Sequence, residues 1–496
     1  MATQGSDPAT APDTPQRSPP HVNLDGRTLE GGGQLLRNAV ALSALTGRPI
    51  TVNHIRGNRQ GKTGLKGSHA AAVKLLAEIS RSTVSDGRVG AQNMTFEPQS
   101  LIARDTTSPA TSLVPLSNVA VKSQYDIRLN SPGSIFLIFQ ALYPYLLHVG
   151  SQASTSHLSL TITGGTNGSR ALSYDYASQV MAPNFARLGL PPLSITLHKR
   201  GWSTGPVGMG TVTFSIQPLG PLDDKDAQQK DQQRSITDNY INPPTIAAEP
   251  RFPHIDIMSH ERGKINQIDI TVLATDNVVP GESQPVRKYV ERMTRKTLRQ
   301  ALAALDPSTF DVASDPTLSL DENVDGASDR KASVPIRIHA SEPTSHIARL
   351  YLLIVAHTST GFRIGHDKLL EDIKSGKHPK QKHKNTKKNK QQRGQAGQQQ
   401  SELARITGLV EQCVEGFIAE LSDGPNLSKS QASGEVSGSR SLFDSHMRDQ
   451  VVVFEALGRL GRERSAPQIQ EDQRFWTLHT QTARWVCQEI LGDVWD

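Results

Sequence analysis

Two kinds of apolar segment alternate along the first half of this 496-residue chain, and the alternation limits the folds available to it. Segments with the alternating pattern of β-strands are residues 22–26, 49–56 and 157–165. Segments with helical spacing are residues 34–46, 68–79 and 134–149. We expect Ser68 to be the N-cap of the second helix. Strands followed by helices, in repetition, predict an α/β fold.

Residues 134–149 are the most apolar of these segments, but they do not have the properties of a membrane span. The segment has 16 residues and contains Gln140 and Pro144, whereas a bilayer requires about 20 mostly apolar residues. We therefore expect a helix buried in a core. Residues 1–20 contain five prolines and no apolar run, so we expect a disordered tail, neither a signal peptide nor a membrane anchor.

Hydrophobic residues make up only 36% of the chain, which is low for one compact globule of this size. Long polar segments account for this value, and they are residues 220–251, 374–400 and 422–441. We expect a solvated insertion, a low-complexity stretch and a flexible Ser/Gly linker, in that order. The two cysteines, Cys413 and Cys487, cannot support a disulfide-rich fold and favour a reducing compartment.

The positive charge of the chain lies in one stretch. Residues 374–393 hold eight lysines, one arginine and no acid, and without them the net charge of +6 becomes −3. This stretch predicts either a nuclear localisation signal or an electrostatic tether for RNA. On the first interpretation the protein is nuclear, in the nucleoplasm or nucleolus, with a cytoplasmic pool as a further expectation.

The first motif with chemical meaning is Glu30-Gly31-Gly32-Gly33-Gln34-Leu35-Leu36-Arg37. Three glycines allow the backbone to approach a ligand closely at a helix start, where exposed amides favour an anion. Gln34 and Arg37 share one helix face, and Glu30 can bind a hard cation such as Mg²⁺. The alternative is an ordinary glycine turn with a surface Glu and Arg.

A second motif, residues 55–64, reads IRGNRQGKTG. It is not a Walker A loop, because three residues separate the first glycine from the Gly-Lys pair and that motif requires four. The motif instead predicts a loop at the end of a strand, whose basic side chains, Arg56, Arg59 and Lys62, are suited to bind phosphate. His69 follows at the start of the next helix. A solvated basic loop is the alternative.

Two further motifs lie near the end of the chain. The sequence Leu478-His479-Thr480-Gln481-Thr482-Ala483 precedes an amphipathic helix that Gly492 can end. The positive end of the helix dipole disfavours the protonated form of a histidine at a helix N-terminus. We therefore expect His479 to be neutral and nucleophilic near pH 7. Asp449 and Gln450 precede an apolar run, and we expect them to open a helix and to contact a base or ribose. A structural role for either motif is the alternative.

Together these segments resemble the RNA 3′-terminal phosphate cyclase family. The matching segments are residues 24–37, 55–65 with His69, 131–140, 164–167, 175–176, 357–361, 448–457 and 478–483. They occur in family order. The pair formed by EGGGQ-x-LR and LHTQTA is specific.

The resemblance implies an AMP- and pyrophosphate-forming ligase that uses ATP and Mg²⁺ as cofactors and RNA with a 3′-terminal phosphate as its partner. It implies conversion of that phosphate to a 2′,3′-cyclic phosphodiester through a histidine–AMP intermediate on His479. Glu30 matches the metal position, and Arg37, Arg56 and Arg59 match catalytic contacts to phosphates. Matches to nucleotide-binding positions are Gln34, Gln140, His446, Asp449 and Gln450. Nothing in the sequence specifies an oligomeric state.

The family fold implies a large domain of three repeated units, each with two helices on a four-stranded sheet, and a smaller inserted α/β domain. On this chain the large catalytic domain would cover residues 21–255 and 441–496. The inserted domain would cover 256–440.

The sequence departs from the family pattern at Ser68, where a Gln is usual, at His446, where an aromatic is usual, and in the glycine run of residues 204–212. A sister branch of the fold acts in small-subunit ribosomal RNA processing, without cyclase chemistry and without the nucleophilic His. LHTQTA favours the cyclase over that branch. A non-enzymatic RNA-binding protein is a third alternative, which leaves the Glu30 and His479 motifs unexplained.

Overall fold

The computed structural model describes the chain over residues 21–59, 61–99, 113–114, 121–152, 156–169, 171–220, 251–278, 283–311, 334–370, 391–422, 441–462, 471, 473 and 476–495. For residues 391–401 it describes the backbone alone. The predictions for residues 1–20, and for most of the segments 220–251, 374–400 and 422–441, fall outside the described residues.

The first sheet is built from one parallel pair and one hairpin. Its elements are β1 (Val22–Asp25), α1 (Gly33–Thr46), β2 (Ile50–Asn53), α2 (Gly67–Ser80), β3 (Thr83–Ser85) and β4 (Met94–Glu97). β1 and β2 are parallel and joined through α1, whereas β4 is antiparallel to both β2 and β3. The resulting strand order is β1-β2-β4-β3.

A second sheet repeats this arrangement. Its elements are β5 (Gln124–Arg128), α3 (Ile135–Val149), β6 (Leu158–Gly164), α4 (Tyr174–Tyr176), η3 (Ala177–Met181), α5 (Ala182–Arg187), β7 (Leu193–Lys199) and β8 (Gly210–Ile216). The order β5-β6-β8-β7 matches that of the first sheet position by position. Along β6 and β8 every second residue is buried, because one face of the sheet packs on the core.

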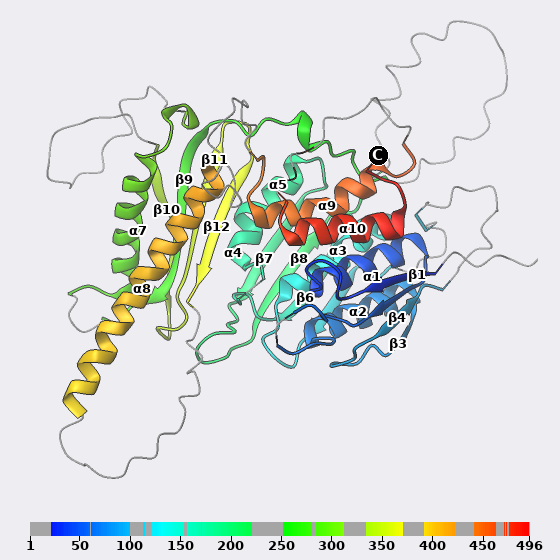
Figure 1. Cartoon of the computed structure of the whole chain (residues 1–496), viewed down its shortest axis with the longest axis horizontal. Helices are drawn as coiled ribbons and strands as arrows, with labels where there is room; N and C mark the ends of the chain where they lie inside the picture. Colours follow the sequence, from blue (N-terminus) through cyan, green and yellow to red (C-terminus); the bar gives the residue numbers. More distant parts are fainter. Residues whose placement is uncertain are drawn as a thin grey trace, which may run out of the picture.

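The third sheet has a different order, β10-β9-β11-β12. Its elements are β9 (Ile265–Thr275), α7 (Val286–Leu302), β10 (Ile336–Thr344), β11 (Tyr351–Thr358), β12 (Arg363–Leu369) and α8 (Gln391–Ser422). Figure 1 shows α7 and α8 together over this sheet, away from the other two sheets. The central strands β9 and β11 are buried nearly throughout, because both faces of the sheet are covered.

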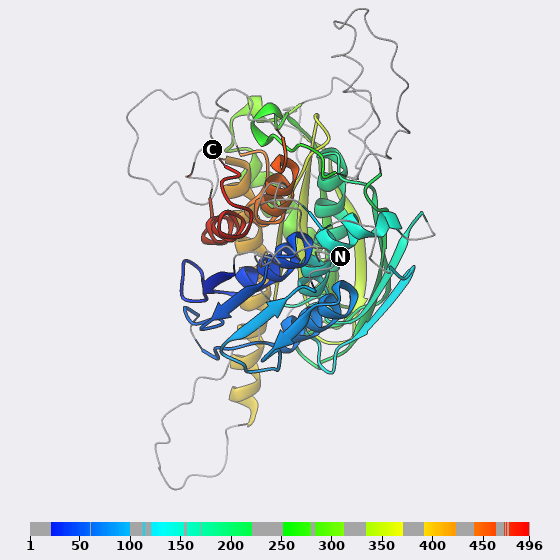
Figure 2. The same ribbon diagram turned by 90° about the vertical axis from the view of Figure 1, so that its right-hand side faces the viewer.

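Two helices complete the fold, α9 (Ser445–Arg459) and α10 (Leu478–Leu491). α10 packs against both α9 and α1, although α1 ends at Thr46, far from both helices in sequence (Figures 1 and 2). One hydrophobic core joins these helices with the first two sheets and one face of the third. A second core lies between the other face of the third sheet and the helices α7 and α8.

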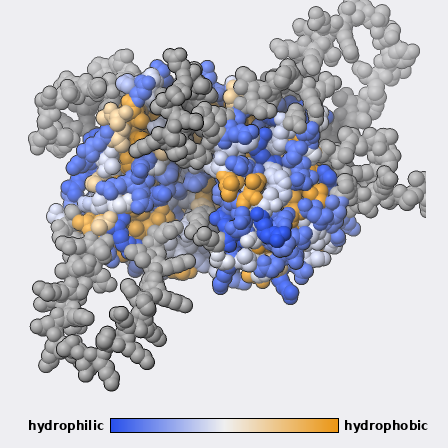
Figure 3. Space-filling view, viewed as in Figure 1, coloured by the Kyte–Doolittle hydropathy of each residue, from blue (hydrophilic) through white to orange (hydrophobic). Residues whose placement is uncertain are grey.

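These elements confirm the α/β class, the helix expected at 134–149 and the three predicted strands. α8 begins at Gln391, inside the segment 374–400 whose composition indicated low complexity. No helix in the described part of the chain combines the length and apolarity needed to cross a bilayer. Figure 3 shows a face on which hydrophilic residues predominate and apolar ones form small groups among them.

Three expectations about helix starts were wrong. α2 begins at Gly67 after an extended Lys66, and no side chain caps it, so Ser68 lies inside the first turn. α9 begins four residues before Asp449, because the buried Asp444 accepts hydrogen bonds from the N–H groups of His446 and Met447. α10 already includes the segment 478–483 that was expected to precede it.

Candidate active site

The turn between β1 and α1 buries a carboxylate at the start of a helix. Glu30 is 8% exposed, and its N–H donates to Thr482 Oγ1 at 3.2 Å. Gly31 has φ +59°, and a Cβ there would lie 2.5 Å from the Gly26 carbonyl oxygen, so this position requires glycine. A Cβ on Gly32 would lie 2.0 Å from Glu30 Oε2 and would displace the carboxylate. The turn therefore holds the Glu30 carboxylate against the backbone at the N-terminus of α1.

Glu30 forms an ion pair with Arg59, from the loop that follows β2. Oε1 of Glu30 faces the Arg59 guanidinium, whereas Oε2 accepts no hydrogen bond from the described residues. A buried carboxylate oxygen with a free lone pair is a suitable ligand for a hard cation. The described residues contain no group of three or more His, Cys, Asp or Glu that could hold a metal. A Mg²⁺ ion at Glu30 would therefore take further ligands from a bound substrate and from water.

His479 is the second residue of α10, and its side chain is 42% exposed. Thr477 is the N-cap of this helix, since its Oγ1 accepts from the N–H of Thr480 at 3.0 Å. Nδ1 of His479 lies 2.8 Å from Gln34 Oε1 and 3.7 Å from Glu30 Oε2. The helix start thus presents the imidazole to the N-terminus of α1.

Gln34 determines which ring nitrogen of His479 carries the proton. Gln34 Nε2 donates to the backbone carbonyl of Asp449 at 3.5 Å, so Gln34 Oε1 is the atom that faces His479. Because this oxygen can only accept, Nδ1 of His479 must be the protonated nitrogen. Nε2 then keeps its lone pair, as a nucleophile requires.

Positive charges surround the His479 ring. Burial, followed by the charges of Arg59, Arg37 and His446, lowers the pKa of His479 to about 4, so the ring is neutral at pH 7. Arg37 stands one turn after Gln34 on α1, and burial lowers its pKa to about 10. Arg37 therefore stays cationic at neutral pH. A neutral nucleophile among fixed cations is well suited to transfer of a phosphorus group.

His69 lies near Arg37, and Arg56 is close enough to act on its charge state. Arg56 has φ +59°, an uncommon conformation for a residue with a side chain. His69 is buried on α2, and a Cβ on Gly33 would lie 2.3 Å from its Cε1. Burial first, and then nearby cations that include Arg37 and Arg56, lower the pKa of His69 to about 3. His69 is thus a neutral, buried neighbour of the arginines.

Asp449 ties α9 to the start of α10. Its Oδ1 accepts from Thr477 Oγ1 at 2.8 Å and from Thr480 Oγ1 at 2.6 Å. The residue is 8% exposed, and burial raises the pKa of its carboxyl to about 6. The position of His479 therefore depends on α9 as well as on α1.

His446 lies one turn before Asp449 on α9. Its ring packs edge-on against Tyr176 at 6.0 Å and parallel to His366 at 6.5 Å. Burial opposes the imidazolium, but nearby carboxyls outweigh it and raise the pKa of His446; they belong to Asp367, Asp444, Asp449 and Glu420. The usual aromatic is thus replaced by a ring within an acidic cluster.

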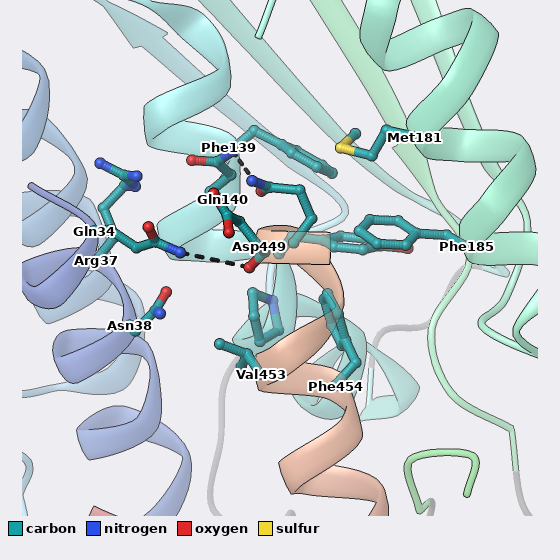
Figure 4. Close-up of a pocket in the computed structure, with 13 residues that line it drawn as sticks. Gln34, Arg37, Asn38, Phe139, Gln140, Met181, Phe185, Asp449, Val453 and Phe454 are labelled. Carbon is teal, nitrogen blue, oxygen red and sulfur yellow. Dashed lines mark hydrogen bonds between the residues drawn. The ribbon is translucent and has the colours of Figure 1, made fainter. Parts of the chain in front are cut away.

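A small pocket open to solvent lies between α1, α3 and α9. Figure 4 shows the side-chain amide of Gln34 on α1 reaching Asp449 on α9. Gln140 Nε2 donates to Gln450 Oε1 at 2.5 Å across the pocket. Aromatic side chains form much of the remaining wall, and they are Phe139, Tyr143, Phe185 and Phe454. The pocket combines flat apolar surfaces with a few polar groups, as small-molecule sites do.

The structure places the site residues predicted from sequence in this one region. Each of them lies near His479, near Arg37 or along the pocket. Their roles stay predictions. Sequence reasoning missed Thr477 and Thr480, although a threonine before a helix signals an N-cap. It also missed Asn38 and Tyr143, which line the pocket; Asn38 Nδ2 and Tyr143 Oη have no hydrogen-bond partner among the residues that the structure describes. No sequence signal distinguishes these two residues.

Comparison with protein families decides the relationship. The model of the family described as RNA 3′-terminal phosphate cyclase matches residues 28–494. The chain belongs to the RNA 3′-terminal phosphate cyclase family. A match of this length includes both the Glu30 turn and the His479 helix. The cyclase family therefore accounts for almost the whole chain, with the third sheet and its helices included.

Individual cyclases match a smaller part. The RNA 3′-terminal phosphate cyclase of Koribacter versatilis (strain Ellin345) is 32% identical over 201 residues, which are 40% of this chain and 49% of the relative. That of Caldivirga maquilingensis (strain ATCC 700844 / DSM 13496 / JCM 10307 / IC-167) is 34% identical over 201 residues, with the same coverage. The chain thus spans about half the length of the curated relatives it matches.

Proposed function

We propose that this cyclase-family protein transfers AMP from ATP to His479 and then to an RNA 3′-phosphate, which closes to a 2′,3′-cyclic phosphodiester. The observation that carries the proposal is the hydrogen bond between His479 Nδ1 and Gln34 Oε1. It places the proton on Nδ1 and leaves Nε2 as a nucleophile. The pKa of about 4 keeps this nucleophile neutral at physiological pH.

In the first step, Nε2 of His479 would attack the α-phosphorus of ATP. An N–P bond forms, the bond from that phosphorus to the bridging oxygen of the β-phosphate breaks, and pyrophosphate leaves with the electron pair. The imidazole becomes positively charged while Nδ1 keeps its proton. Glu30 Oε2, at 3.7 Å from Nδ1, would stabilise that charge.

The cations of the site would hold the phosphates. Arg37 and Arg59 are close enough to lower the pKa of His479, so they can also stabilise negative charge that develops on the phosphate oxygens. Arg56 lies beyond them, beside His69. A Mg²⁺ ion bound through Glu30 would neutralise charge on the pyrophosphate leaving group.

The pocket between α1, α3 and α9 would take part of the nucleotide. Gln140 and Gln450 can exchange their mutual hydrogen bond for bonds to a base or ribose. Asp449 lines the same pocket, and His446 lies one helical turn away on α9. ATP would therefore lie along the start of α9, with its phosphates towards His479.

Two further steps would use the RNA. An oxygen of the RNA 3′-phosphate attacks the AMP phosphorus, and the N–P bond to His479 breaks. The neighbouring 2′-OH then attacks the 3′-phosphorus, loses its proton and expels AMP. The net reaction consumes no water and uses one ATP for each cyclic end that forms.

Incubation with ATP labelled at the α-phosphate, followed by a denaturing gel, tests the first step. We expect a covalent label that is lost in acid and kept in base, as an N–P bond requires. His479→Ala should abolish both the label and the cyclisation of an RNA 3′-phosphate. Persistent labelling of His479→Ala would reject the assignment of the nucleophile.

The same gel separates the cyclase from the non-catalytic alternative. A wild-type protein without label would favour a cyclase-like factor in small-subunit ribosomal RNA processing. Family membership alone does not distinguish these two functions. A nuclear location is part of the proposal and rests only on the basic stretch 374–393.

A further inference from the structure

Seven side chains on and around α9 and α10 contact one another in a closed ring. The helices lie side by side (Figure 1), and the ring joins them at several points. Its members, in order of contact, are Arg448, Glu471, Trp476, Arg484, Trp495, Arg459 and Glu455. We refer to these residues as the α9–α10 ring.

Buried ion pairs form one half of the ring. Arg448 is 2% exposed, and its guanidinium donates to both carboxylate oxygens of Glu471 at 2.6–2.9 Å. The same group donates to Glu455 Oε2 at 3.1 Å, and Arg459 donates to Glu455 Oε1 at 3.1 Å. Glu471 Oε2 also accepts from the indole N–H of Trp476 at 2.9 Å.

Cation–π contacts close the other half. The guanidinium of Arg484 lies 4.3 Å from the ring centre of Trp476 and 3.8 Å from that of Trp495. Arg459 lies 5.3 Å from the ring centre of Trp495. Contacts of this kind contribute more when the groups are desolvated, and Arg484 is partly buried.

The ring does not touch the pocket, but two of its members are chain neighbours of site residues. None of the ring residues lines the pocket between α1, α3 and α9. Arg448 directly precedes Asp449, and Trp476 directly precedes Thr477, the N-cap of α10. Thr477 Oγ1 in turn donates to Asp449 Oδ1 at 2.8 Å. The contacts from Arg448 through Glu471 to Trp476 therefore join the same two segments as the Asp449–Thr477 hydrogen bond. They do so through the residues that directly precede Asp449 and Thr477.

We propose that the α9–α10 ring positions the nucleophile, with Glu471 and Trp476 as positioning residues for His479. The inference rests on the proposed function. Glu471 and Trp476 lie in the segment that leads into α10, so their contacts to Arg448 set where the N-cap meets Asp449. His479 follows the N-cap by two residues, and a displacement of the cap by a fraction of an ångström displaces the imidazole with it. A misplacement of about 1 Å at a reacting group can cost about 10²-fold in rate.

The chemistry of the ring favours positioning over simple stabilisation. A buried arginine with two carboxylates costs desolvation that its ion pairs barely offset, and apolar side chains of the same volume can stabilise as well or better. Bidentate guanidinium–carboxylate pairs do provide fixed geometry. At Arg448 this geometry is supplied one residue before Asp449, where the site needs it.

Trp476→Phe is the sharpest test, because it removes one indole N–H and keeps an aromatic ring for Arg484. The matched control is Trp485→Phe on α10, the helix that Trp476 precedes. Trp485 donates its indole N–H to Glu489 at 3.0 Å, outside the hydrogen bonds, ion pairs and cation–π contacts that form the ring. Single-turnover adenylation with α-labelled ATP and thermal unfolding are measured on both full-length variants.

We expect Trp476→Phe to lower the maximal adenylation rate by about fivefold to tenfold, as loss of a hydrogen bond to a charged group commonly does. The ATP concentration for half-maximal rate should change by less than about twofold, because the ring does not touch the pocket. Trp485→Phe should match the wild type in rate. Both variants should unfold within about 2 °C of each other.

Glu471→Gln and Glu471→Asp provide a graded series. The Gln variant loses the charge that Arg448 requires, and its rate should fall by about 10²-fold. Asp keeps the charge and should recover part of that rate. Equal rates for Trp476→Phe and Trp485→Phe, or a loss confined to ATP affinity, would overturn the positioning role. A wild-type protein that takes up no label would overturn the proposed function and the positioning role with it, so the two failures are distinguishable.

Discussion

The first and second sheets have the same strand order, yet only the loops of the first carry charged site residues. The turns after β1 and β2 hold Glu30, Arg56 and Arg59. They also contain three residues other than glycine with positive φ, namely Leu29, His54 and Arg56. In the second sheet unit, residues 121–220, the described residues include no such conformation outside glycine.

The corresponding turns of the second sheet serve packing. A Cβ on Gly164 would lie 2.7 Å from the Gly133 carbonyl oxygen, and one on Gly165 would lie 2.6 Å from that of Pro132. The turns after β5 and β6 are thus in close backbone contact. Thr166, which follows, is fully buried and bonded to the backbone of Gly201.

The comparison teaches that a shared topology delivers equivalent strand ends, while the loops decide what those ends do. A residue other than glycine in a strained conformation costs about 1–3 kcal/mol and persists only where its surroundings require it. Three of the five such residues in the described part of the chain lie in the two loops that carry Glu30 and Arg59. The predictions that follow test whether strain and chemistry belong together in the first sheet.

The largest expected effect comes from the Glu30 carboxylate. Glu30→Gln should lower the adenylation rate by about 10²–10³-fold, because a charged group at the phosphates is lost. The charge lost is that of the proposed Mg²⁺ ligand, and without it the metal would no longer neutralise the phosphates, so the Mg²⁺ concentration needed for activity should also rise. Asp126→Asn, an exposed acid on β5 of the second sheet, is the matched control and should leave the rate unchanged. An unaltered rate and metal titration in Glu30→Gln would reject the metal role.

Arg56→Gly separates backbone strain from charge. Glycine accepts φ +59° without steric cost, so the variant should lose about 1 kcal/mol of strain, while glycine's extra chain entropy offsets part of the gain. Loss of the cation should lower kcat/KM for ATP by about tenfold or more. Arg81→Gly, with φ 52° at the end of α2, is the control that should relieve strain without changing activity. Equal activity of both variants would contradict a phosphate contact for Arg56.

Asp449→Asn should change the pH dependence more than the maximal rate. The pKa of Asp449 is raised from 3.8 to about 6, so its contribution to stability is present below about pH 4 and is lost as the pH rises through 6. Asn cannot ionise, so the variant should gain stability relative to wild type more at pH 8 than at pH 4. Thermal unfolding at both pH values checks this.

The same variant assigns the inflections of the pH–rate profile. An inflection near pH 6 should disappear in Asp449→Asn, while the fall near pH 4 from protonation of His479 should remain. An inflection near 6 that persists in the variant would assign it to another group.

The smallest effect on adenylation is expected from deletion of residues 374–393, which lie far from both sheets in sequence. Self-adenylation needs no RNA and should be unchanged. Suppose that half of the nine basic residues contact phosphates. The slope of the logarithm of long-RNA affinity against the logarithm of salt concentration should then become shallower by roughly 3, at about 0.7 per contact. Equal affinity and equal slope in the deletion variant would leave only the targeting role.

Local patterns in the sequence predicted much of the fold. The spacing of apolar residues predicted α1, α3 and β6 within a residue or two, because periodicity reports which face of an element is buried. Helix starts were less predictable. Asp444 rather than Asp449 begins α9, since the cap is also held by Tyr176 and by the Gly365 N–H, which are distant in sequence.

By itself, the sequence determined the α/β class, the glycine turn that buries Glu30, the helix that presents His479 and the family that joins them. Only the tertiary structure decided that Gln34 meets both His479 and Asp449, across separations of 445 and 415 residues. It also decided which nitrogen of His479 keeps its lone pair and which residues form the α9–α10 ring. The physical reason is that periodicity and capping act over one or two helical turns, whereas contacts between distant segments depend on how whole elements pack into one core.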